Sequence, residues 1–195
     1  MPHLVAAACA TGPVTRMRAL LVQRARGEVL ELGLGAGANL PFYDVSWVRR
    51  VSSVEPSAVL RARAKKVQTA FKVDVEDGEA ERLPWADASF DTVVCTFTLC
   101  TVRDPALALR EARRVLRPGG QFLYCEHGLS SDVGVARWQV RIEPVWKRLA
   151  GGCHLTRDAE RLLGEAGFAV VQLGSGFLQR TPRFVGWHVW GEAVR

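Results

Sequence analysis

An apolar segment that runs directly into a glycine-rich loop constrains the fold of this chain more than any other feature. Residues 29–37 read Val-Leu-Glu-Leu-Gly-Leu-Gly-Ala-Gly, so Gly33, Gly35 and Gly37 follow a short strand-like run. Glycines at the end of a strand permit a tight turn and a close approach of the backbone to a ligand. The loop predicts a ligand site at a strand end, although spaced glycines alone are a weak signal.

Strand-like and helix-like segments alternate along the chain. This alternation predicts an α/β fold, a mostly parallel sheet with helices on both faces. Asp104 and Pro105 form a strong helix start, and the turn at 117–120 ends that helix. The last two strands have too short a connection for a parallel crossover and should be antiparallel. The expected strands lie at 28–32, 51–54, 71–75, 90–97, 121–126, 168–173 and 185–190.

The last third of the chain carries two helical patterns. Residues 135–149 are amphipathic and hold Trp138 and Trp146, whose spacing of eight residues places them on one helix face. That face either docks on the core or forms an apolar wall of a substrate site. Residues 135–155 are the expected lid, since nothing else in the chain remains to cover the site. Thr156 is the expected cap of a helix that ends near residue 166.

Length and composition indicate one compact globular domain. The 195 residues are 48% hydrophobic, which predicts one domain over residues 1–195, with residues 1–27 as an N-terminal helical segment. The formal charge of +6 comes from basic residues that are scattered along the chain. A scatter is typical of a solvated surface, whereas a dense block would indicate a nucleic-acid arm, so we expect no nucleic-acid partner. Attraction to an acidic substrate or an anionic membrane surface stays open, and the sequence indicates no particular oligomeric state.

The cysteine pattern and the N-terminal residues indicate in which cellular compartment the protein is expected. The five cysteines are odd in number and form no Cys-x-x-Cys pair, so neither a disulfide framework nor a metal site is indicated. Cys95, Cys100 and Cys125 stand in or beside apolar runs and should be buried. Residues 1–10 lack the basic region of a secretory signal, and no apolar stretch reaches the ~18 residues of a membrane helix. We therefore expect a cytoplasmic protein without an integral membrane segment.

Two acidic residues suggest what the glycine loop binds. Glu31 stands inside the strand before the loop, and Glu55 ends the next strand, about 20 residues on, where a carboxylate can accept both ribose hydroxyls. The loop spacing differs from the Gly-x-Gly-x-x-Gly pattern that favours a dinucleotide pyrophosphate. An anionic pyrophosphate prefers helix N-termini and cations, whereas Glu31 suits a cationic ligand. The alternative for Glu31 is a salt-bridged surface acid.

Four further motifs stand in a fixed order along the chain: residues 29–42, residues 54–57, residues 78–85 followed by 89–91, and residues 114–120. They resemble, in turn, the first motif, the acidic second-strand motif, the segment into strand four and the turn into strand five of one family. That family is the class I S-adenosylmethionine-dependent methyltransferases of the methyltransferase type 11 group. The resemblance implies a Rossmann-like three-layer sandwich. Its seven-stranded sheet would have the order 3-2-1-4-5-7-6 with strand 7 antiparallel.

The resemblance also implies residue roles toward S-adenosyl-L-methionine, whose product is S-adenosyl-L-homocysteine. The three glycines match those that line the methionine part, Glu31 lies near its amino group, and Glu55 binds the ribose. Glu79 meets the adenine amino group, and the backbones of Ala80 and Thr96 face the adenine ring and the ammonium. The full set of expected cofactor-binding residues is Glu31, Gly33, Gly35, Gly37, Asn39, Glu55, Pro56, Glu79, Ala80 and Thr96.

A closer resemblance is carried by residues 93–102, 126–127, 138–139, 144–146 and 152–157. These segments resemble the methyltransferase-like group that includes animal thiol S-methyltransferases. This resemblance implies a small, rather apolar acceptor, with a thiol as the leading candidate. Quinone, phenol and phospholipid-amine acceptors stay open, as do a non-catalytic S-adenosylmethionine-binding module and a nicotinamide-dependent oxidoreductase. The acid-rich loop argues against the last of these.

His127 is the candidate catalytic residue. It follows the fifth strand, at the carboxyl edge where ligands bind in open α/β sheets. A histidine there can take a proton near neutral pH and could act as the general base toward the acceptor. The alternative is a neutral histidine bonded to a loop carbonyl. Cys100 could also face the site, although a buried thiol is the simpler interpretation.

Overall fold

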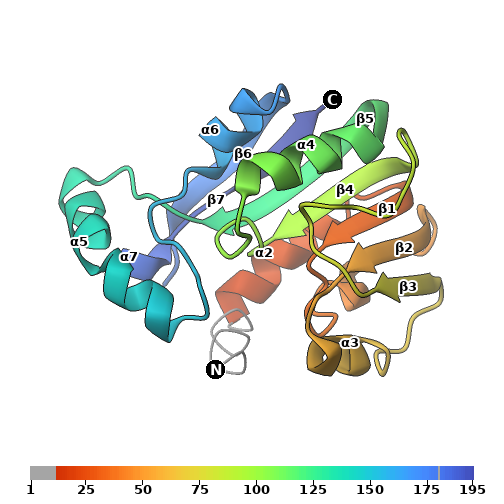
Figure 1. Ribbon diagram of the computed structural model, residues 1–195, viewed down its shortest axis with the longest axis horizontal. Coiled ribbons are helices and arrows are strands. Elements are labelled where there is room, and N and C mark those ends of the chain that lie inside the picture. Colours follow the sequence, from red (N-terminus) through yellow and green to blue (C-terminus); the bar gives the residue numbers. More distant parts are fainter. Residues whose placement is uncertain (1–11, 180) are drawn as a thin grey trace.

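The computed structural model describes residues 12–179 and 181–195. Its centre is one sheet of seven strands in the order β3-β2-β1-β4-β5-β7-β6 (Figure 1). The strands are β1 (Gly27–Leu32), β2 (Val48–Val54), β3 (Lys72–Glu76), β4 (Phe90–Thr96), β5 (Leu116–His127), β6 (Ala169–Phe177) and β7 (Trp187–Val194). Strands β1 to β5 pair in parallel, and β7 is antiparallel to both β5 and β6. The predicted sheet order and the antiparallel seventh strand are confirmed.

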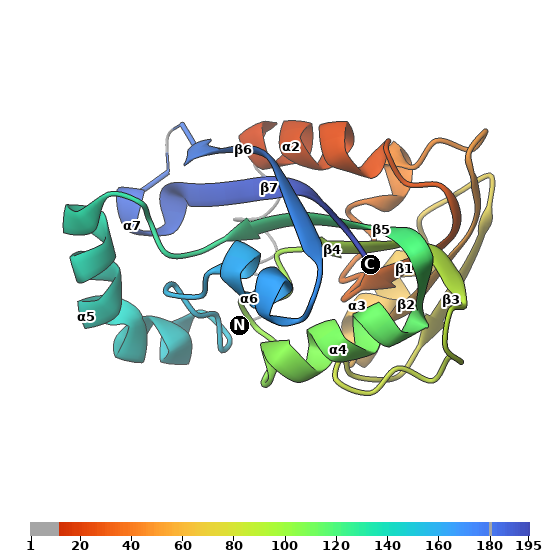
Figure 2. The ribbon, with the colours of Figure 1, turned by 90° about the horizontal axis from the view of Figure 1, so that it is seen from above.

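Helices cover both faces of the sheet, as Figure 2 shows from above. The helical elements are α2 (Gly12–Val22), η1 (Leu40–Phe42), α3 (Ala58–Ala64), α4 (Pro105–Val115), α5 (Val133–Leu149), α6 (Ala159–Glu165) and α7 (Arg183–Gly186). In the core, Leu30 and Leu32 of β1 pack in one cluster with α4 and α6. Val29 packs in a second cluster with α2 and α3. The strand is therefore buried on both faces, which explains its nearly continuous apolar sequence.

Local signals set several boundaries as predicted. Asp104 caps α4, because its carboxylate accepts a hydrogen bond from the Leu107 N–H at 2.9 Å, and Pro105 occupies the first turn. Cys95, Cys100 and Cys125 are buried, as expected from their apolar surroundings. Among the described residues, no helix combines the length and apolar character needed to cross a bilayer. The expectations for residues 1–11 fall outside the described residues.

The expected cap of the helix that ends near residue 166 was wrong by two residues. Asp158, not Thr156, caps α6 by accepting a hydrogen bond from the Arg161 N–H at 3.0 Å. The Thr156 N–H instead donates to Glu143 Oε2 of α5 at 2.8 Å, so its backbone ties the preceding loop to that helix.

Several strand boundaries also differ. Strand β2 begins at Val48 and not at residue 51, and β6 and β7 run to Phe177 and Val194 and not to residues 173 and 190. The last strand begins at Trp187 and not at residue 185, because Arg183–Gly186 form the short helix α7. The fifth strand begins at Leu116, which pairs with Phe90, so the expected turn at 117–120 lies within β5 as an irregularity of the ladder. A register shift between Phe90 and Thr92 accommodates these residues.

Candidate active site

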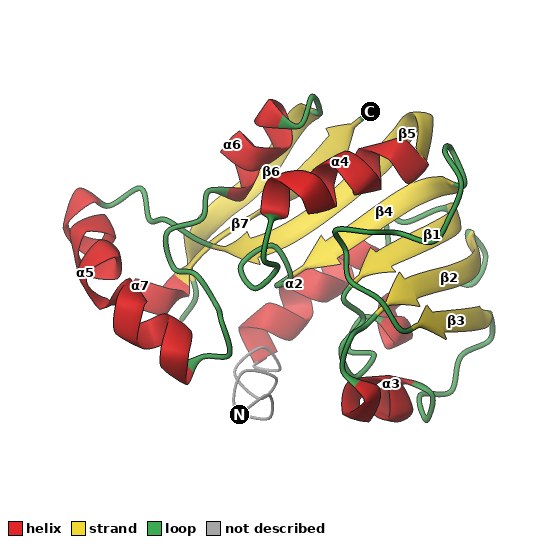
Figure 3. Ribbon diagram, viewed as in Figure 1, coloured by secondary structure: helices red, strands yellow, loops and turns green. Residues whose placement is uncertain are grey.

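The carboxyl ends of β1 to β5 meet at one edge of the sheet, which Figure 3 shows as a row of arrowheads. Helix α5 lies beyond the end of β5 on that same side (Figure 1). Loops that follow parallel strands converge at such an edge, and open α/β sheets bind their ligands there. The predicted site residues Glu31, Glu55, Thr96 and His127 all lie at or just beyond these strand ends.

Glu31, Asn39 and Thr96 form one buried hydrogen-bond network. Asn39 Nδ2 donates to Glu31 Oε1 and to Thr96 Oγ1, both at 2.9 Å, and the Tyr43 hydroxyl donates to Glu31 Oε2 at 2.7 Å. Glu31 is only 2% exposed, so it is not the surface acid of the alternative interpretation. Burial raises the pKa of Glu31 to about 7, while the hydrogen bond from Tyr43 and the charge of Arg18 oppose that shift.

Arg18 of α2 joins this network and was not predicted. Its Nη1 donates to Asn39 Oδ1 at 2.8 Å and to Thr96 Oγ1 at 2.7 Å, and its guanidinium lies 4.8 Å from the centre of the Phe97 ring. The side chain is buried, and its Nε has no hydrogen-bond partner among the described residues. A buried guanidinium with an unused donor is suited to a carboxylate ligand. The only sequence signal was the expected N-terminal helical segment over residues 1–27.

The glycine loop has the backbone conformation that its sequence requires. Gly33, Gly35 and Gly37 all have positive φ values, +68°, +59° and +84°. A Cβ atom at Gly33 would lie 2.9 Å from Thr98 Oγ1, whereas at Gly35 it would meet nothing within 4 Å. Gly35 therefore leaves open space beside the loop, and its N–H donates to Glu55 Oε2 at 2.9 Å.

Glu55 holds the loop and the next helix together. Its second oxygen, Oε1, accepts a hydrogen bond from the Ser57 N–H at 2.9 Å, and the residue is buried. Each carboxylate oxygen has a further lone pair, so Glu55 can still accept hydroxyl donors. The buried acids and the unused Arg18 donor fit a ligand that carries an ammonium, a carboxylate and a ribose.

The remaining predicted residues lie farther from this network. Pro56 is exposed just after β2, and Ala80 is buried in the loop that follows β3. The Glu79 side chain is about half exposed, and its Oε1 lies 3.8 Å from Nη2 of Arg103. The structure thus brings Glu31, Asn39 and Thr96 together and joins Glu55 to Gly35, whereas Glu79 and Pro56 are exposed residues outside both groups.

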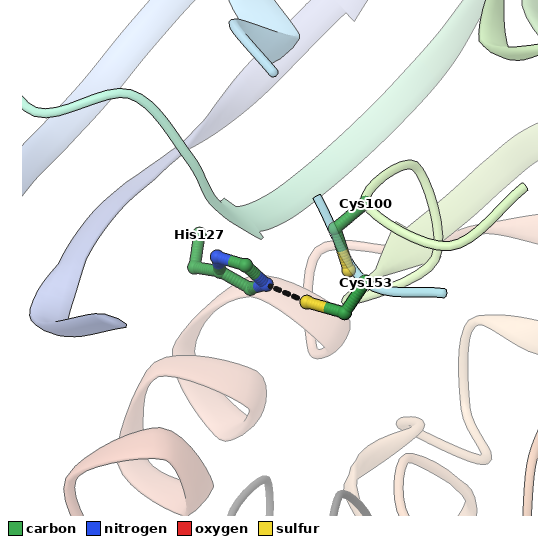
Figure 4. A group of neighbouring side chains, drawn as sticks. All are labelled: Cys100, His127 and Cys153. Atoms are coloured by element: carbon green, nitrogen blue, oxygen red, sulfur yellow. Dashed lines mark hydrogen bonds between the residues drawn. The ribbon is translucent and has the colours of Figure 1, made fainter. Parts of the chain in front are cut away.

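Three chemically reactive side chains meet at the ends of β4 and β5 (Figure 4). Nε2 of His127 lies 2.9 Å from Sγ of Cys153, and the ligand atoms of Cys100, His127 and Cys153 all lie within 4.8 Å of one another. No His127 ring nitrogen bonds a loop carbonyl among the described residues, since Nδ1 is buried without a partner. Cys153 was not predicted as a site residue.

These groups alter one another's protonation. Hydrogen bonding from Cys100, and then from His127, lowers the pKa of the Cys153 thiol to about 4, against the effect of burial. Burial by itself lowers the pKa of His127, but its contact with Cys153 and the charge of Glu126 raise it overall.

Buried Glu126 orders the loop that carries Cys100. Its Oε1 accepts hydrogen bonds from the Thr98 N–H at 2.7 Å and the Leu99 N–H at 3.1 Å. The adjacent residue is His127, so one dipeptide at the end of β5 holds the β4 loop in place and supplies a functional side chain.

Comparison with known proteins identifies the family of this chain. Residues 30–124 match a family model described as a methyltransferase domain. The chain is 35% identical over 178 residues to thiol S-methyltransferase TMT1B of Rattus norvegicus, covering 86% of this chain and 70% of that protein. It is 33% identical over 174 residues to human thiol S-methyltransferase TMT1A, with the same coverage. The chain belongs to the class I S-adenosylmethionine-dependent methyltransferases.

A solved structure supports the same fold. An S-adenosylmethionine-dependent methyltransferase from Mesorhizobium loti superimposes with a TM-score of 0.71 at 20% identity, over 95% of this chain and 99% of that one. As a member of the class I methyltransferases, the protein uses S-adenosylmethionine as its cofactor. This agrees with the buried acids at the ends of β1 and β2.

The methyltransferase's expected lid is organised around one buried side chain. In α5, Gln139 Nε2 donates to the carbonyl oxygens of Gly128 at 2.9 Å and Phe184 at 3.0 Å, and its Oε1 accepts from the Ser130 N–H at 2.9 Å. Gln139 is the only buried residue of this helix. The helix is thereby fixed at its middle to the loop after β5 and to α7.

The two tryptophans of α5 do not share one environment. Trp146 packs against the cluster of Cys100, Ala150 and Cys153, and its ring lies 5.5 Å from that of Phe184. Trp138 is 58% exposed, so of the two alternatives for that helix face, docking on the core does not hold for this residue. The reason is that the helix contacts the protein through Gln139 and Trp146, which leaves Trp138 outside the contact.

Proposed function

We propose that this methyltransferase transfers the methyl group of S-adenosylmethionine to the sulfur of a small thiol. The observation that carries the proposal is the 35% identity over 86% of the chain to a protein named thiol S-methyltransferase. The site supports it, because His127, two thiols and the Trp146 ring lie together at the ends of β4 and β5, where we place the acceptor. Residues 135–155 remain the proposed lid.

The geometry of the strand ends supports a proposed set of cofactor contacts. Glu31 and Asn39 are proposed to bind the ammonium of the methionine part, and Arg18 its carboxylate through the unused Nε. Glu55 accepts the ribose hydroxyls, and the open space at Gly35 admits the cofactor beside the loop. Glu79 and the backbones of Ala80 and Thr96 keep their expected roles toward the adenine and the ammonium, and Gly33, Gly37 and Pro56 shape the site.

The bound cofactor supplies an electrophilic methyl group on a positively charged sulfur. The protein must align the acceptor sulfur in line with that methyl group and exclude water, and such alignment can lower a barrier by about 7–11 kcal/mol. His127 is the proposed catalytic residue, because its Nε2 lies beside the buried sulfurs where the acceptor arrives. Its sequence-based role as a proton acceptor stays a prediction.

An acceptor screen tests the proposed function. The full chain is incubated with S-adenosylmethionine and a panel of alkyl thiols, phenols, quinones and amines, and both S-adenosylhomocysteine and the methylated product are measured. We expect turnover with thiols and a methyl thioether as the product. Turnover only with a quinone, phenol or amine would contradict the thiol assignment, and cofactor binding without turnover on any acceptor would indicate a binding module.

A further inference from the structure

We propose that Cys100, His127 and Cys153 bind a zinc ion whose fourth ligand is the sulfur of the acceptor thiol. The inference rests on the proposed function for its substrate, but the metal site itself is argued from the three side chains. Two cysteine sulfurs and an imidazole nitrogen are the donors that zinc prefers over magnesium or calcium.

The distances are suited to one tetrahedral ion. Zinc lies about 2.3 Å from sulfur and about 2.0 Å from nitrogen, which places its ligand atoms roughly 3.5–3.8 Å apart. The three ligand atoms here lie within 4.8 Å of one another. His127 Nε2 and Cys153 Sγ, now 2.9 Å apart, need to separate by only about half an ångström to bind the ion.

The backbone holds the two cysteines together although they are far apart in sequence. The His154 N–H donates to the Cys100 carbonyl oxygen at 2.8 Å, which fixes the residue after Cys153 against the β4 loop. A second link comes from Arg157, whose Nη1 donates to the Leu99 carbonyl oxygen. The cluster is therefore built from two loops that are hydrogen-bonded to each other, and not from flexible side chains on a surface.

The number of ligands indicates a metal with an open position. Among the described residues, the group contains three metal-binding side chains and no fourth His, Cys, Asp or Glu. Structural zinc sites use four protein ligands, whereas catalytic sites use three and leave the fourth position to water or substrate. All three residues of the group are buried, so a bound ion would be shielded from bulk water.

The surrounding charge favours an anionic fourth ligand. Two cysteine thiolates and a neutral histidine balance the charge of Zn²⁺, so an added thiolate gives the site one negative charge. Arg157 interacts electrostatically with both Cys100 and Cys153 and can compensate that charge. A thiol bound to zinc loses its proton outright, and this supplies the nucleophile without a separate base.

The methyl transfer balances in atoms and charge when the acceptor thiol is bound to zinc. The acceptor thiol replaces a water molecule on zinc and releases its proton to solvent. Its sulfur then forms a bond to the methyl carbon as the bond between that carbon and the sulfonium breaks, and the electron pair of the broken bond stays on S-adenosylhomocysteine. The neutral methyl thioether is a weaker zinc ligand than a thiolate, so water displaces it. In this scheme His127 holds the metal and takes no proton.

Metal content is the first test, because it does not depend on activity. The full chain is purified with a phosphine reductant, since a thiol reductant would compete for the fourth position, and zinc is measured by mass spectrometry. We expect about one zinc ion per chain, and a loss of affinity of at least about tenfold in Cys153→Ser and His127→Gln. The matched control Cys125→Ala, a buried cysteine outside the cluster, should keep its zinc. Binding of S-adenosylmethionine by every variant confirms that each is folded.

Cobalt substitution tests the open position. Cobalt(II) in place of zinc should show the intense visible absorption of a tetrahedral, thiolate-bound ion, and an alkyl thiol should shift that spectrum without any S-adenosylmethionine. A spectrum that does not respond to the thiol would overturn the open position.

Chelation separates this inference from the proposed function. We expect removal of zinc to lower thiol methylation at least about tenfold, and added zinc chloride to restore it. Absence of zinc together with methylation that survives chelation would overturn the metal site and leave the proposed function standing. Bound zinc without methylation of any thiol would overturn the acceptor role, whereas the metal site would remain.

Discussion

Glu31 links the charge of the cofactor site to pH. Its carboxyl has a pKa of about 7 in the free protein, so part of the population is protonated at neutral pH. A bound ammonium needs the carboxylate, and each pH unit below this pKa weakens binding by up to about tenfold. We predict that affinity for S-adenosylmethionine rises from about pH 5.5 to about pH 8, as calorimetry can measure.

The variant Glu31→Gln isolates this effect. It should bind the cofactor at least about tenfold more weakly at about pH 8 and lose the pH dependence. The raised pKa also means that the folded state binds more protons than the unfolded state between about pH 4.5 and about pH 7. The contribution of Glu31 to the free energy of unfolding therefore falls as the pH rises through that window, and Glu31→Gln should remove this fall. An unchanged pH profile of binding in Glu31→Gln would contradict the assignment.

Arg18 is predicted to recognise the amino-acid part of the cofactor and not the nucleoside. Arg18→Met removes the guanidinium that bonds Asn39 and Thr96, and we expect affinity for S-adenosylhomocysteine to fall about 10- to 100-fold. Methylthioadenosine lacks the amino-acid part, so its affinity should stay within about twofold, since it loses no charged hydrogen bond. Glu55→Ala is the matched control, because loss of the ribose contact should weaken both ligands. Equal losses of both ligands in Arg18→Met would contradict the role.

At the scale of the element, α5 depends on one side chain for its position. Gln139→Ala leaves the Gly128 and Phe184 carbonyl oxygens and the Ser130 N–H without their partner. Unsatisfied buried groups of this kind cost about 1–3 kcal/mol in the free energy of unfolding, which urea denaturation can measure. We also expect kcat/KM for the thiol to fall, because α5 packs Trp146 on the Cys153 cluster.

Val140→Ala provides the control for this prediction. Val140 is the next residue of α5, but its side chain is 60% exposed, so its loss should change both stability and kcat/KM little. Equal effects of the two substitutions would show that Gln139 does not fix the helix.

Local signals explain which features of the whole molecule could be predicted. The strand before Gly33, the Asp104 cap and the order of the strands follow from short sequence patterns and the motifs they form. Arg18 could not be found in this way, because its contact with Thr96 spans 78 residues and leaves no spacing pattern. The Cys153 cluster was missed for the same reason, since Cys100 and Cys153 come from separate loops and His127 from the end of β5, and only the folded sheet edge brings them together.

The thermal stability of the whole molecule should rise when the cofactor binds. A ligand that binds only the folded state at about 100 times its Kd adds about 2.7 kcal/mol to the free energy of unfolding. For a domain of this size, that raises Tm by about 5–10 °C. We expect S-adenosylmethionine to produce this shift and NADH to produce none. At the same concentration of S-adenosylmethionine, the rise in Tm should be larger at about pH 8 than at about pH 6, because Glu31 is ionised at the higher pH. Glu31→Gln should give equal, smaller shifts at the two pH values. An equal shift with NADH would contradict the match between the acid-rich strand ends and a cationic cofactor, since a pyrophosphate gains nothing from a buried carboxylate.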